Sequence, residues 1–511
     1  MTKILKFLSS RLVAWIVLML IQIGWFLSVF LYFHNHFSYV GPIMQAIAIL
    51  MVLFIVNNQT NPSYKLAWSI LILGAPILGI CMYCLFGSRE ITKKNRKKLQ
   101  VTHTKSVKYL YDDEATIRKL AKRSRGASKQ AEYISKWSDF PAYESEGVTY
   151  YRMGDDTLQP ILAEIAKAKN YIFLEFFIIQ EGIFLNSVID ALEQKVKEGV
   201  EVRLMYDDMG SVSTVPIDYD RTLEQKGIHC IKFNPLKPLL SVVMNNRDHR
   251  KMIIIDGKVA FTGGFNLADE YINQRERFGH WKDNGLKVEG QAVANFVAMF
   301  LEMWQYASGI PEDESRYFTD YNSMEKHVQE GFIQPYADSP LDREKVGETV
   351  YLNIINRAKD YIYIFTPYLI IDNEMMTALC NAAKSGVDIR IVTPGIPDKK
   401  LVFLLTQSYY AQLLEAGVKI YEYGPGFIHA KTFVCDDVIA TVGTINLDYR
   451  SLYMHFECGV WMYGTPEVAQ IKQDALDTFQ ISRLITYEHE MSQSWMKKTL
   501  QGILRLFAPL L

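Results

Sequence analysis

Long apolar stretches dominate the first 86 residues of the chain. Residues 12–33 carry no charge, and the run is long enough to cross a bilayer core of about 30 Å as a helix. Shorter apolar stretches follow at about 40–56 and at 66–86, and Pro76 should kink the second of these. The pattern predicts a transmembrane anchor over residues 1–88 with two or three helices.

Basic residues flank this anchor on both sides. Because the cytoplasmic flanks of membrane helices are enriched in Lys and Arg, both ends of the anchor should lie in the cytoplasm, which requires an even number of crossings. A helical hairpin is therefore favoured, with one short stretch failing to span. The stretch 89–145 is predicted to be a basic juxtamembrane linker that attracts anionic membrane lipid. The flanking cations are Lys3, Lys6 and Arg11 before the anchor, and Arg89, Lys93, Lys94, Arg96, Lys97 and Lys98 after it.

The opposite end of the chain, residues 491–511, has the pattern of an amphipathic helix. Its apolar residues lie largely on one helical face, bordered by Lys497, Lys498 and Arg505. Such a helix either lies in the membrane interface or docks on the protein core, and both alternatives fit the pattern.

Between these ends, apolar strands alternate with helical stretches, and the arrangement occurs twice. Residues 171–179 and 361–370 form near-continuous apolar runs, which are typical of strands buried on both faces between helix layers. Each run precedes a helical stretch that ends near Gly and then a second apolar strand. We predict an α/β protein with two α/β/α sandwich domains, 146–330 and 331–490, related by a pseudo-two-fold axis.

Composition and short motifs narrow the function classes. Six cysteines form no metal-ligand cluster, and the closely spaced Cys81 and Cys84 lie inside an apolar stretch without polar ligands. The sequence contains no HExxH motif and no phosphate-binding P-loop. A basic, aromatic-interleaved groove for nucleic acid is not evident either. We therefore expect no metal, no cofactor and no nucleic-acid partner, and the oligomeric state stays open.

Each half also carries the motif His-x-Lys-x4-Asp, followed at the same distance by Gly and Asn. One such match is expected by chance at a level of roughly a few per cent in a chain of this length, so two with equal offsets are not a coincidence. Within each motif, His and Lys are two residues apart and should point to the same side of an extended segment. The residues are His249, Lys251, Asp256, Gly263 and Asn266 in the first copy, and His429, Lys431, Asp436, Gly443 and Asn446 in the second.

This duplicated motif resembles that of the phospholipase D superfamily. The segments NPSYKLAW, PILG…YCLFG, GHWKDNG and NLDYRSLYMHFE make the chain similar to the bacterial cardiolipin synthases. Gly264 and Thr444 depart from the pattern, since many superfamily members have Ser there. The resemblance implies phosphatidyl transfer between two phosphatidylglycerol molecules, which gives cardiolipin and glycerol through a covalent phosphatidyl-histidine. It also implies a multi-pass protein of the cell membrane, and the flanking charges place the catalytic domains in the cytoplasm.

The motif residues suit this chemistry. A neutral imidazole can attack phosphorus, and a protonated imidazole can donate to the departing alkoxide. The family implies His249 as the nucleophile and His429 as the acid and base, while the symmetric motifs alone allow either assignment. Both sets should face one site at the domain interface. Positive charge and amide donors for the substrate phosphate should come from Lys251, Lys431, Asn266 and Asn446.

Each catalytic imidazole needs a partner for its second ring nitrogen, and this partner is often a carboxylate. The superfamily pattern implies Glu457 as the partner of His429, and we choose Asp283 as the partner of His249. The two acids that complete the motifs should be structural, because they point away from the lysines on an extended strand. These acids are Asp256 and Asp436.

Alternative functions fit the same motifs. Water in place of the acceptor alcohol would make the protein a phospholipase D-type hydrolase or a nuclease, and another alcohol would make it a different phosphatidyltransferase. The membrane anchor disfavours a nuclease, and two intact motifs argue against a non-catalytic lipid-binding scaffold. Weaker site candidates, each compatible with a structural role, are Asp207, Asp208, Arg450, Ser451, His280 and His455.

Overall fold

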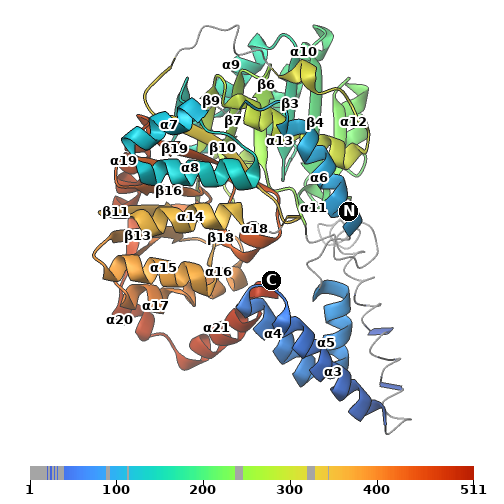
Figure 1. The fold of residues 1–511 in the computed structure, drawn as a ribbon, viewed down its shortest axis with the longest axis vertical. Helices are drawn as coiled ribbons and strands as arrows, with labels where there is room; N and C mark the ends of the chain where they lie inside the picture. The colour runs from blue at the N-terminus through green and yellow to red at the C-terminus, as the bar shows by residue number, and fades with distance from the viewer. Residues whose placement is uncertain are drawn as a thin grey trace.

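A computed structural model describes most of the chain and shows two α/β lobes beside a smaller helical group (Figure 1). Most of the predicted first membrane stretch, 12–33, lies outside the described residues. Within the part that is described, no helix is both long enough and apolar enough to cross a membrane. The two or three membrane crossings stay a prediction. The described residues are 20, 24–25, 28, 31–32, 39–87, 93–111, 114–235, 246–318, 328–342 and 344–510.

The smaller group lies at one end of the molecule and contains three helices (Figure 1). They are α3 (Val40–Asn57), α4 (Pro62–Gly74) and α5 (Pro76–Met82), and a π-helical turn, η1 (Tyr83–Gly87), follows α5. Pro76 separates α4 from α5, because a proline ring has no N–H to donate and clashes with the preceding helical turn. The kink predicted at Pro76 is confirmed as a break between two helices.

The stretch predicted as a linker contains helices that pack on the lobes. α6 packs along α13 of the first lobe. Two cations of the basic run contribute to the docking, because Lys98 Nζ donates to Tyr306 O at 2.6 Å and Arg96 Nε donates to Leu341 O at 2.8 Å. The helices of this stretch are α6 (Lys93–Val107), α7 (Glu114–Arg123) and α8 (Arg125–Ser138), whereas α13 (Val293–Ser308) belongs to the first lobe.

The first lobe is built on a seven-stranded sheet with the order β2-β9-β7-β6-β3-β4-β5. Neighbours β3, β4 and β5 are parallel, and the other pairs are antiparallel. Alternate residues of β3 enter two different hydrophobic cores, so both faces of this strand are covered. The strands are β2 (Val148–Tyr151), β3 (Tyr171–Phe176), β4 (Glu201–Asp207), β5 (His229–Phe233), β6 (Lys251–Ile255), β7 (Val259–Gly263) and β9 (Gly285–Glu289). Besides α13, the helices are η2 (Gly154–Asp156), α9 (Leu158–Lys167), α10 (Ile183–Lys197), α11 (Asp208–Ser211), α12 (Tyr219–Gln225), η4 (Asp269–Ile272) and η5 (Ser315–Tyr317).

The second lobe contains a nine-stranded sheet with the order β1-β10-β19-β17-β16-β11-β13-β14-β20. From β10 to β14 this order repeats that of the first sheet from β2 to β5, which confirms two α/β domains of one type. The strands are β1 (Tyr143–Glu144), β10 (Phe332–Asp338), β11 (Tyr361–Phe365), β13 (Asp388–Pro394), β14 (Lys419–Tyr423), β16 (Thr432–Cys435), β17 (Ile439–Gly443), β19 (Glu457–Tyr463) and β20 (Ser482–Ile485). The helices are α14 (Val346–Arg357), α15 (Asn373–Lys384), α16 (Lys400–Gln407), α17 (Tyr410–Glu415), α18 (Tyr449–Tyr453) and α19 (Glu467–Gln480).

Short strands connect the lobes. β8 (His280–Lys282) of the first lobe pairs in parallel with β15 (Gly426–Ile428) of the second. β1 precedes the first lobe in the sequence but pairs with β10 in the second sheet. Within the second lobe, a further short pair joins β12 (Leu369–Ile370) to β18 (Leu447–Asp448). Apart from β1, the strands of the two large sheets fall within 148–289 and 332–485.

The C-terminal residues form α20 (Tyr487–Met491), α21 (Trp495–Phe507) and a final turn, η7 (Ala508–Leu510). α21 contacts α16 of the second lobe and α4 of the smaller helical group, and Figure 1 shows it between them. Its opposite side is open, since Trp495 is 75% exposed. The amphipathic helix is therefore docked along one side and leaves apolar side chains exposed on the other.

Candidate active site

The two motif histidines lie at equivalent places, directly before β6 and β16 of the two sheets. Both are nearly buried. Each backbone is held by the opposite lobe, because His249 N donates to Phe456 O at 2.9 Å and His429 N donates to Lys282 O at 2.7 Å. The two motifs therefore meet at the boundary between the lobes.

The carboxylates that orient the histidines also come from the opposite lobe. His249 Nδ1 donates to the Glu457 carboxylate at 2.9 and 3.0 Å, and His429 Nδ1 donates to Asp283 Oδ2 at 2.7 Å. The predicted pairing of Glu457 with His429 and of Asp283 with His249 is wrong. The reason is the exchange of backbone hydrogen bonds described above, because the residue after each accepting carbonyl lies beside the histidine of the other half.

Gly264 and Thr444, the two departures from the superfamily pattern, fit these carboxylates. A Cβ at Gly264 would lie 2.1 Å from Asp283 Oδ1, so a side chain at this position would displace Asp283. In the second half, Thr444 Oγ1 donates to Glu457 Oε2. Asp283 instead accepts the backbone N–H of Asn284 at 2.9 Å. The two half-sites are thus alike in plan but different in how they hold their acids.

The motif lysines are buried beside the histidines. Lys251 Nζ donates to His249 O at 2.6 Å. Lys431 Nζ donates to His429 O and lies 2.9 Å from His429 Nδ1. Each half therefore presents an ammonium group and an imidazole together, which is a favourable arrangement for an anion.

The two motif asparagines differ in their surroundings. Asn266 Oδ1 accepts the N–H of Ile178 at 2.9 Å, and its Nδ2 donates to the Tyr271 hydroxyl at 2.7 Å. Asn446 Oδ1 is buried and has no hydrogen-bond partner among the described residues. A buried polar atom without a partner costs about 1–3 kcal/mol. Asn446 is therefore the better placed of the two to meet a polar ligand.

The acids that complete the motifs hold the backbone of the neighbouring strand. Asp256 accepts the N–H groups of residues 169, 170 and 171 at 2.8 to 2.9 Å, directly before β3. Asp436 accepts those of residues 359, 360 and 361 at the same distances, directly before β11. Both acids act on the opposite end of the motif strand from the histidines.

Comparison with known proteins places this site in a family. The family model for the "Cardiolipin synthase, PLD-like domain" matches residues 161–304 and 351–478, and the model "Phospholipase_D-nuclease N-terminal" matches 46–88. A protein of Geobacillus kaustophilus named cardiolipin synthase is 34% identical over 92% of this chain and 93% of its own length. The chain belongs to the cardiolipin synthase family. As a member of this family it is a phosphatidyltransferase.

Two further relatives extend this comparison. A protein of Streptococcus mutans described as uncharacterized is 46% identical over 90% of this chain and 99% of its own length. The crystal structure of a phosphatidylserine synthase from Haemophilus influenzae has a TM-score of 0.57 and is 15% identical, covering 75% of this chain and 98% of that one. At that identity the structure shows a shared fold alone.

Burial and crowded positive charge shape the titration of the site. Burial, together with Lys251 and Lys431, lowers the pKa of His249 well below its usual value. Burial and Lys431 lower the pKa of His429 to about 4, although Asp283 opposes this. Burial lowers the pKa of Lys251 to about 8 and that of Lys431 to about 7. A bound phosphodiester would add negative charge and raise all four pKa values.

A buried arginine missed by sequence reasoning supports the first half-site. Arg247 donates through Nε and Nη2 to Asp207 at 2.8 to 3.0 Å. Asp207 also accepts the N–H of Asp248 at 3.1 Å and caps α11. Asp207, a weak site candidate at the end of β4, therefore holds the segment that leads into His249. An arginine two residues before the motif histidine was the available signal.

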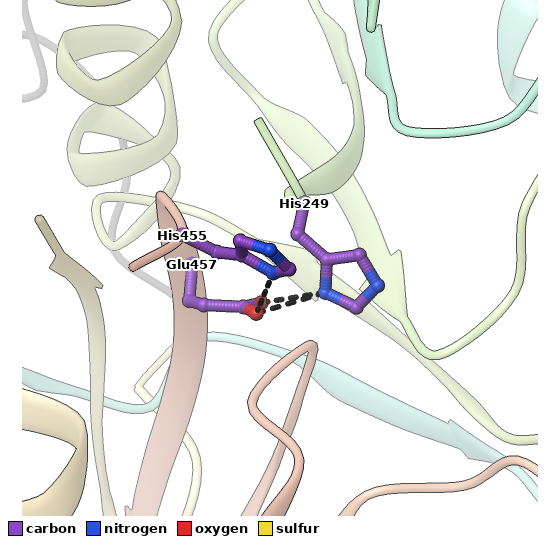
Figure 2. Close-up of side chains that lie close together, drawn as sticks. All are labelled: His249, His455 and Glu457. Carbon is purple, nitrogen blue, oxygen red and sulfur yellow. Dashed lines mark hydrogen bonds and ion pairs between the residues drawn. The ribbon is translucent and has the colours of Figure 1, made fainter. Parts of the chain in front are cut away.

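Of the other weak candidates, some have structural roles and one lies in the site. Asp448 caps α18 by accepting the N–H groups of Arg450 and Ser451, so these two residues begin a helix. His280 bonds the Tyr423 hydroxyl through Nδ1 at 3.0 Å. His455, in contrast, lies beside His249 and Glu457 (Figure 2). These three side chains are also the set among the described residues that could hold a metal ion.

Proposed function

We propose that the protein transfers a phosphatidyl group between two phosphatidylglycerol molecules, giving cardiolipin and glycerol. The observation that carries the proposal is the pair of His/Lys sets at one lobe boundary, each histidine bonded to a carboxylate of the other lobe. One phosphodiester needs a nucleophile on one side and an acid on the other, and two half-sites supply both. The name of the Geobacillus kaustophilus relative supports the same reaction.

In the first step, the Nε2 lone pair of His249 attacks the phosphorus of one phosphatidylglycerol. A P–N bond forms, the P–O bond to the terminal glycerol breaks, and His429 gives its proton to the departing oxygen. The Nδ1–H of His249 donates to Glu457, so the carboxylate stabilises the positive charge that develops on the ring. The product is a phosphatidyl-histidine and free glycerol.

In the second step, a hydroxyl of the second phosphatidylglycerol gives its proton to His429. Its oxygen attacks the same phosphorus, the P–N bond breaks, and His249 regains its lone pair. The product is cardiolipin, and both histidines return to their starting protonation. Lys251 and Lys431 stabilise the charge on the phosphoryl oxygens in both steps.

The two histidines are assigned by their electrostatic surroundings. The pKa of His249 is lowered by burial and by both lysines, which keeps its ring neutral and nucleophilic. The pKa of His429 is lowered to about 4, with Asp283 opposing the effect of burial, whereas Glu457 does not offset burial and the two lysines at His249, whose pKa stays well below its usual value. When the phosphodiester anion enters, His429 is the ring better able to take up a proton. These directions support His249 as the nucleophile and His429 as the acid and base.

The substrates are membrane lipids, and we infer that the catalytic lobes act at the cytoplasmic surface of the cell membrane. The family match over residues 46–88 and the apolar helices α3 to α5 support an attachment of this end to the membrane. The exposed apolar side of α21 lies beside α4 and supports a contact with the same surface.

The test is to incubate the detergent-solubilised full-length protein with phosphatidylglycerol as the only lipid. Cardiolipin and glycerol should appear in equal amounts. His249→Ala and His429→Ala should each lower turnover by roughly 10³-fold or more, because the two rings act as a unit. His280→Ala removes a ring whose one hydrogen bond within the described residues is to Tyr423, so it is the matched control and should retain activity. Phosphatidic acid without cardiolipin would identify a hydrolase and contradict the proposal.

A further inference from the structure

A third imidazole, His455, lies next to the proposed nucleophile (Figure 2). Its ring centre is 5.5 Å from that of His249, and its Nδ1 is 3.7 Å from Glu457 Oε1. The residue is only 9% exposed, yet neither ring nitrogen has a hydrogen-bond partner within the described residues. Burial of an unsatisfied polar group costs about 1–3 kcal/mol, and the proposed transfer reaction assigns His455 no task.

We propose that His249, His455 and Glu457 form a binding site for a zinc-like transition-metal ion, and that the bound ion inhibits the enzyme. One ligand atom from each side chain can be chosen so that all lie within 4.8 Å of one another. Two imidazole nitrogens and one carboxylate oxygen are a ligand set that Zn²⁺ prefers. Mg²⁺ and Ca²⁺ prefer oxygen ligands throughout, so they should not compete.

The inhibition follows from the tautomer that the ion imposes, and this part rests on the proposed function of His249. Without a bound ion, Nδ1 of His249 carries the proton that is donated to Glu457. An ion that takes the Nδ1 lone pair moves this proton to Nε2. The Nε2 atom then has no lone pair with which to attack phosphorus, so no P–N bond can form.

The second half-site contains a matched control. Asp283 stands to His429 as Glu457 stands to His249, and the residue two positions before Asp283 is Trp281. The Trp281 ring centre lies 5.6 Å from that of His429, which is nearly the spacing found between His455 and His249. An indole N–H cannot ligate a metal. The three-ligand set is therefore specific to the half-site that contains His249.

The experiment measures metal binding and inhibition separately on the detergent-solubilised full chain. Co²⁺, the spectroscopic probe for a zinc site, should give a visible absorption band that saturates at one ion per chain. Buffered micromolar Zn²⁺ should inhibit cardiolipin formation, and EDTA should restore or raise activity rather than lower it. His455→Ala and the milder His455→Asn should abolish the band and raise the inhibitory Zn²⁺ concentration by at least about tenfold, a size of effect that even indirect contributors to metal sites show. His280→Ala should leave both unchanged.

Several outcomes would overturn the inference. Absence of a Co²⁺ band in the wild-type chain would do so, and this result does not depend on the folding of any variant. Zn²⁺ inhibition that is unchanged in His455→Asn, or activation by Zn²⁺, would also do so. A Co²⁺ band lost in the His455 variants of a protein that makes no cardiolipin would keep the metal site and reject the proposed function instead.

Discussion

At the scale of single residues, the site is organised by contacts that cross between the lobes. Glu457 of the second lobe bonds His249 of the first, and Asp283 of the first bonds His429 of the second. Each histidine thus depends on an acid from the other half for its tautomer and orientation. The consequence is that neither lobe alone contains a complete half-site.

The crossed pairing predicts which variant an activated donor can rescue. Asp283→Asn and Glu457→Gln should each lower kcat by roughly 10²- to 10⁴-fold, the range of a lost acid or base contribution. A phosphatidyl donor with a nitrophenol leaving group needs no proton on departure. It should restore the first step in Asp283→Asn, whose damaged ring is the acid, and not in Glu457→Gln, whose damaged ring is the nucleophile. The measurement is nitrophenol release under single turnover, and rescue of Glu457→Gln alone would contradict the pairing or the roles assigned to the two histidines.

The covalent intermediate is a second prediction at this scale. With the same activated donor, His429→Ala should accumulate a phosphatidyl group on His249, because the first step needs no acid and the second lacks its base. Mass spectrometry of a peptic digest should locate the adduct on the peptide that contains His249. The adduct should be labile in acid and stable in base, as a P–N bond requires. An adduct on His429 in the His249→Ala protein would reverse the assigned roles.

At the scale of helices and strands, one polar junction links the smaller helical group to the second lobe. Asn61, the N-cap of α4, donates through Nδ2 to Asp372 Oδ2 at 3.0 Å and to the Tyr453 hydroxyl at 3.1 Å. The Tyr453 hydroxyl, which has one proton to donate, lies within hydrogen-bond distance of both Asp372 Oδ2 and Glu348 Oε1. Tyr453 ends α18, which leads directly into His455 and Glu457. The smaller helical group is therefore joined to the strand that orients His249.

This junction predicts a pH dependence of stability. Burial and the neighbouring Asp372 raise the pKa of Glu348 to about 9. A carboxyl group whose pKa is raised in the folded state stabilises the fold at low pH and loses this contribution as pH rises through the folded value. Glu348→Gln, which imitates the neutral acid, should therefore match the wild type near pH 5 and exceed it at pH 9. Since a difference of one in pKa corresponds to about 1.4 kcal/mol, the gain should be more than about 1 kcal/mol.

Thermal unfolding in detergent between pH 5 and pH 9 checks this prediction. Glu114→Gln, on the exposed surface of α7, is the matched control and should unfold in parallel with the wild type at every pH. Parallel curves for Glu348→Gln would show that Glu348 is ionised in the folded protein.

At the scale of the whole molecule, two lobes of one type close around a shared site, and the smaller helical group, α3 to α5, lies at one end (Figure 1). α6 docks along the first lobe through Lys98 and reaches the second through Arg96. Two cations of the basic run, Arg96 and Lys98, therefore help to hold α6 against the catalytic lobes.

The orientation of the molecule in the membrane follows from the basic flanks. Because Lys and Arg mark the cytoplasmic side, the run after the anchor should be inaccessible from outside the cell. The test uses a variant in which Lys97, which is exposed on α6, is replaced by Cys. In the same variant Cys81, Cys84 and Cys230 are replaced by Ser. A membrane-impermeant maleimide should label this cysteine only after the cells are lysed. Labelling in intact cells would place the lobes outside.

The sequence by itself determined the fold class and the reactive groups. Near-continuous apolar runs such as 171–179 predicted strands buried on both faces, and β3 is buried throughout. The duplicated His-x-Lys-x4-Asp motif predicted the histidines and lysines that the fold brings together at the lobe boundary. These features are encoded over a few residues, where strand periodicity and motif spacing act directly.

Only the tertiary structure decided which groups act on one another. Glu457 and His249 are 208 residues apart and Asp283 and His429 are 146 apart, so no local spacing reveals the crossed pairing. The described part of the predicted linker contains the helices α6, α7 and α8. They dock on the lobes because α6 packs against α13 and α8 packs against β10. His455 likewise lies beside His249 through a contact between the two lobes. Such contacts depend on how two separately encoded lobes pack together, and that packing is a property of the whole chain.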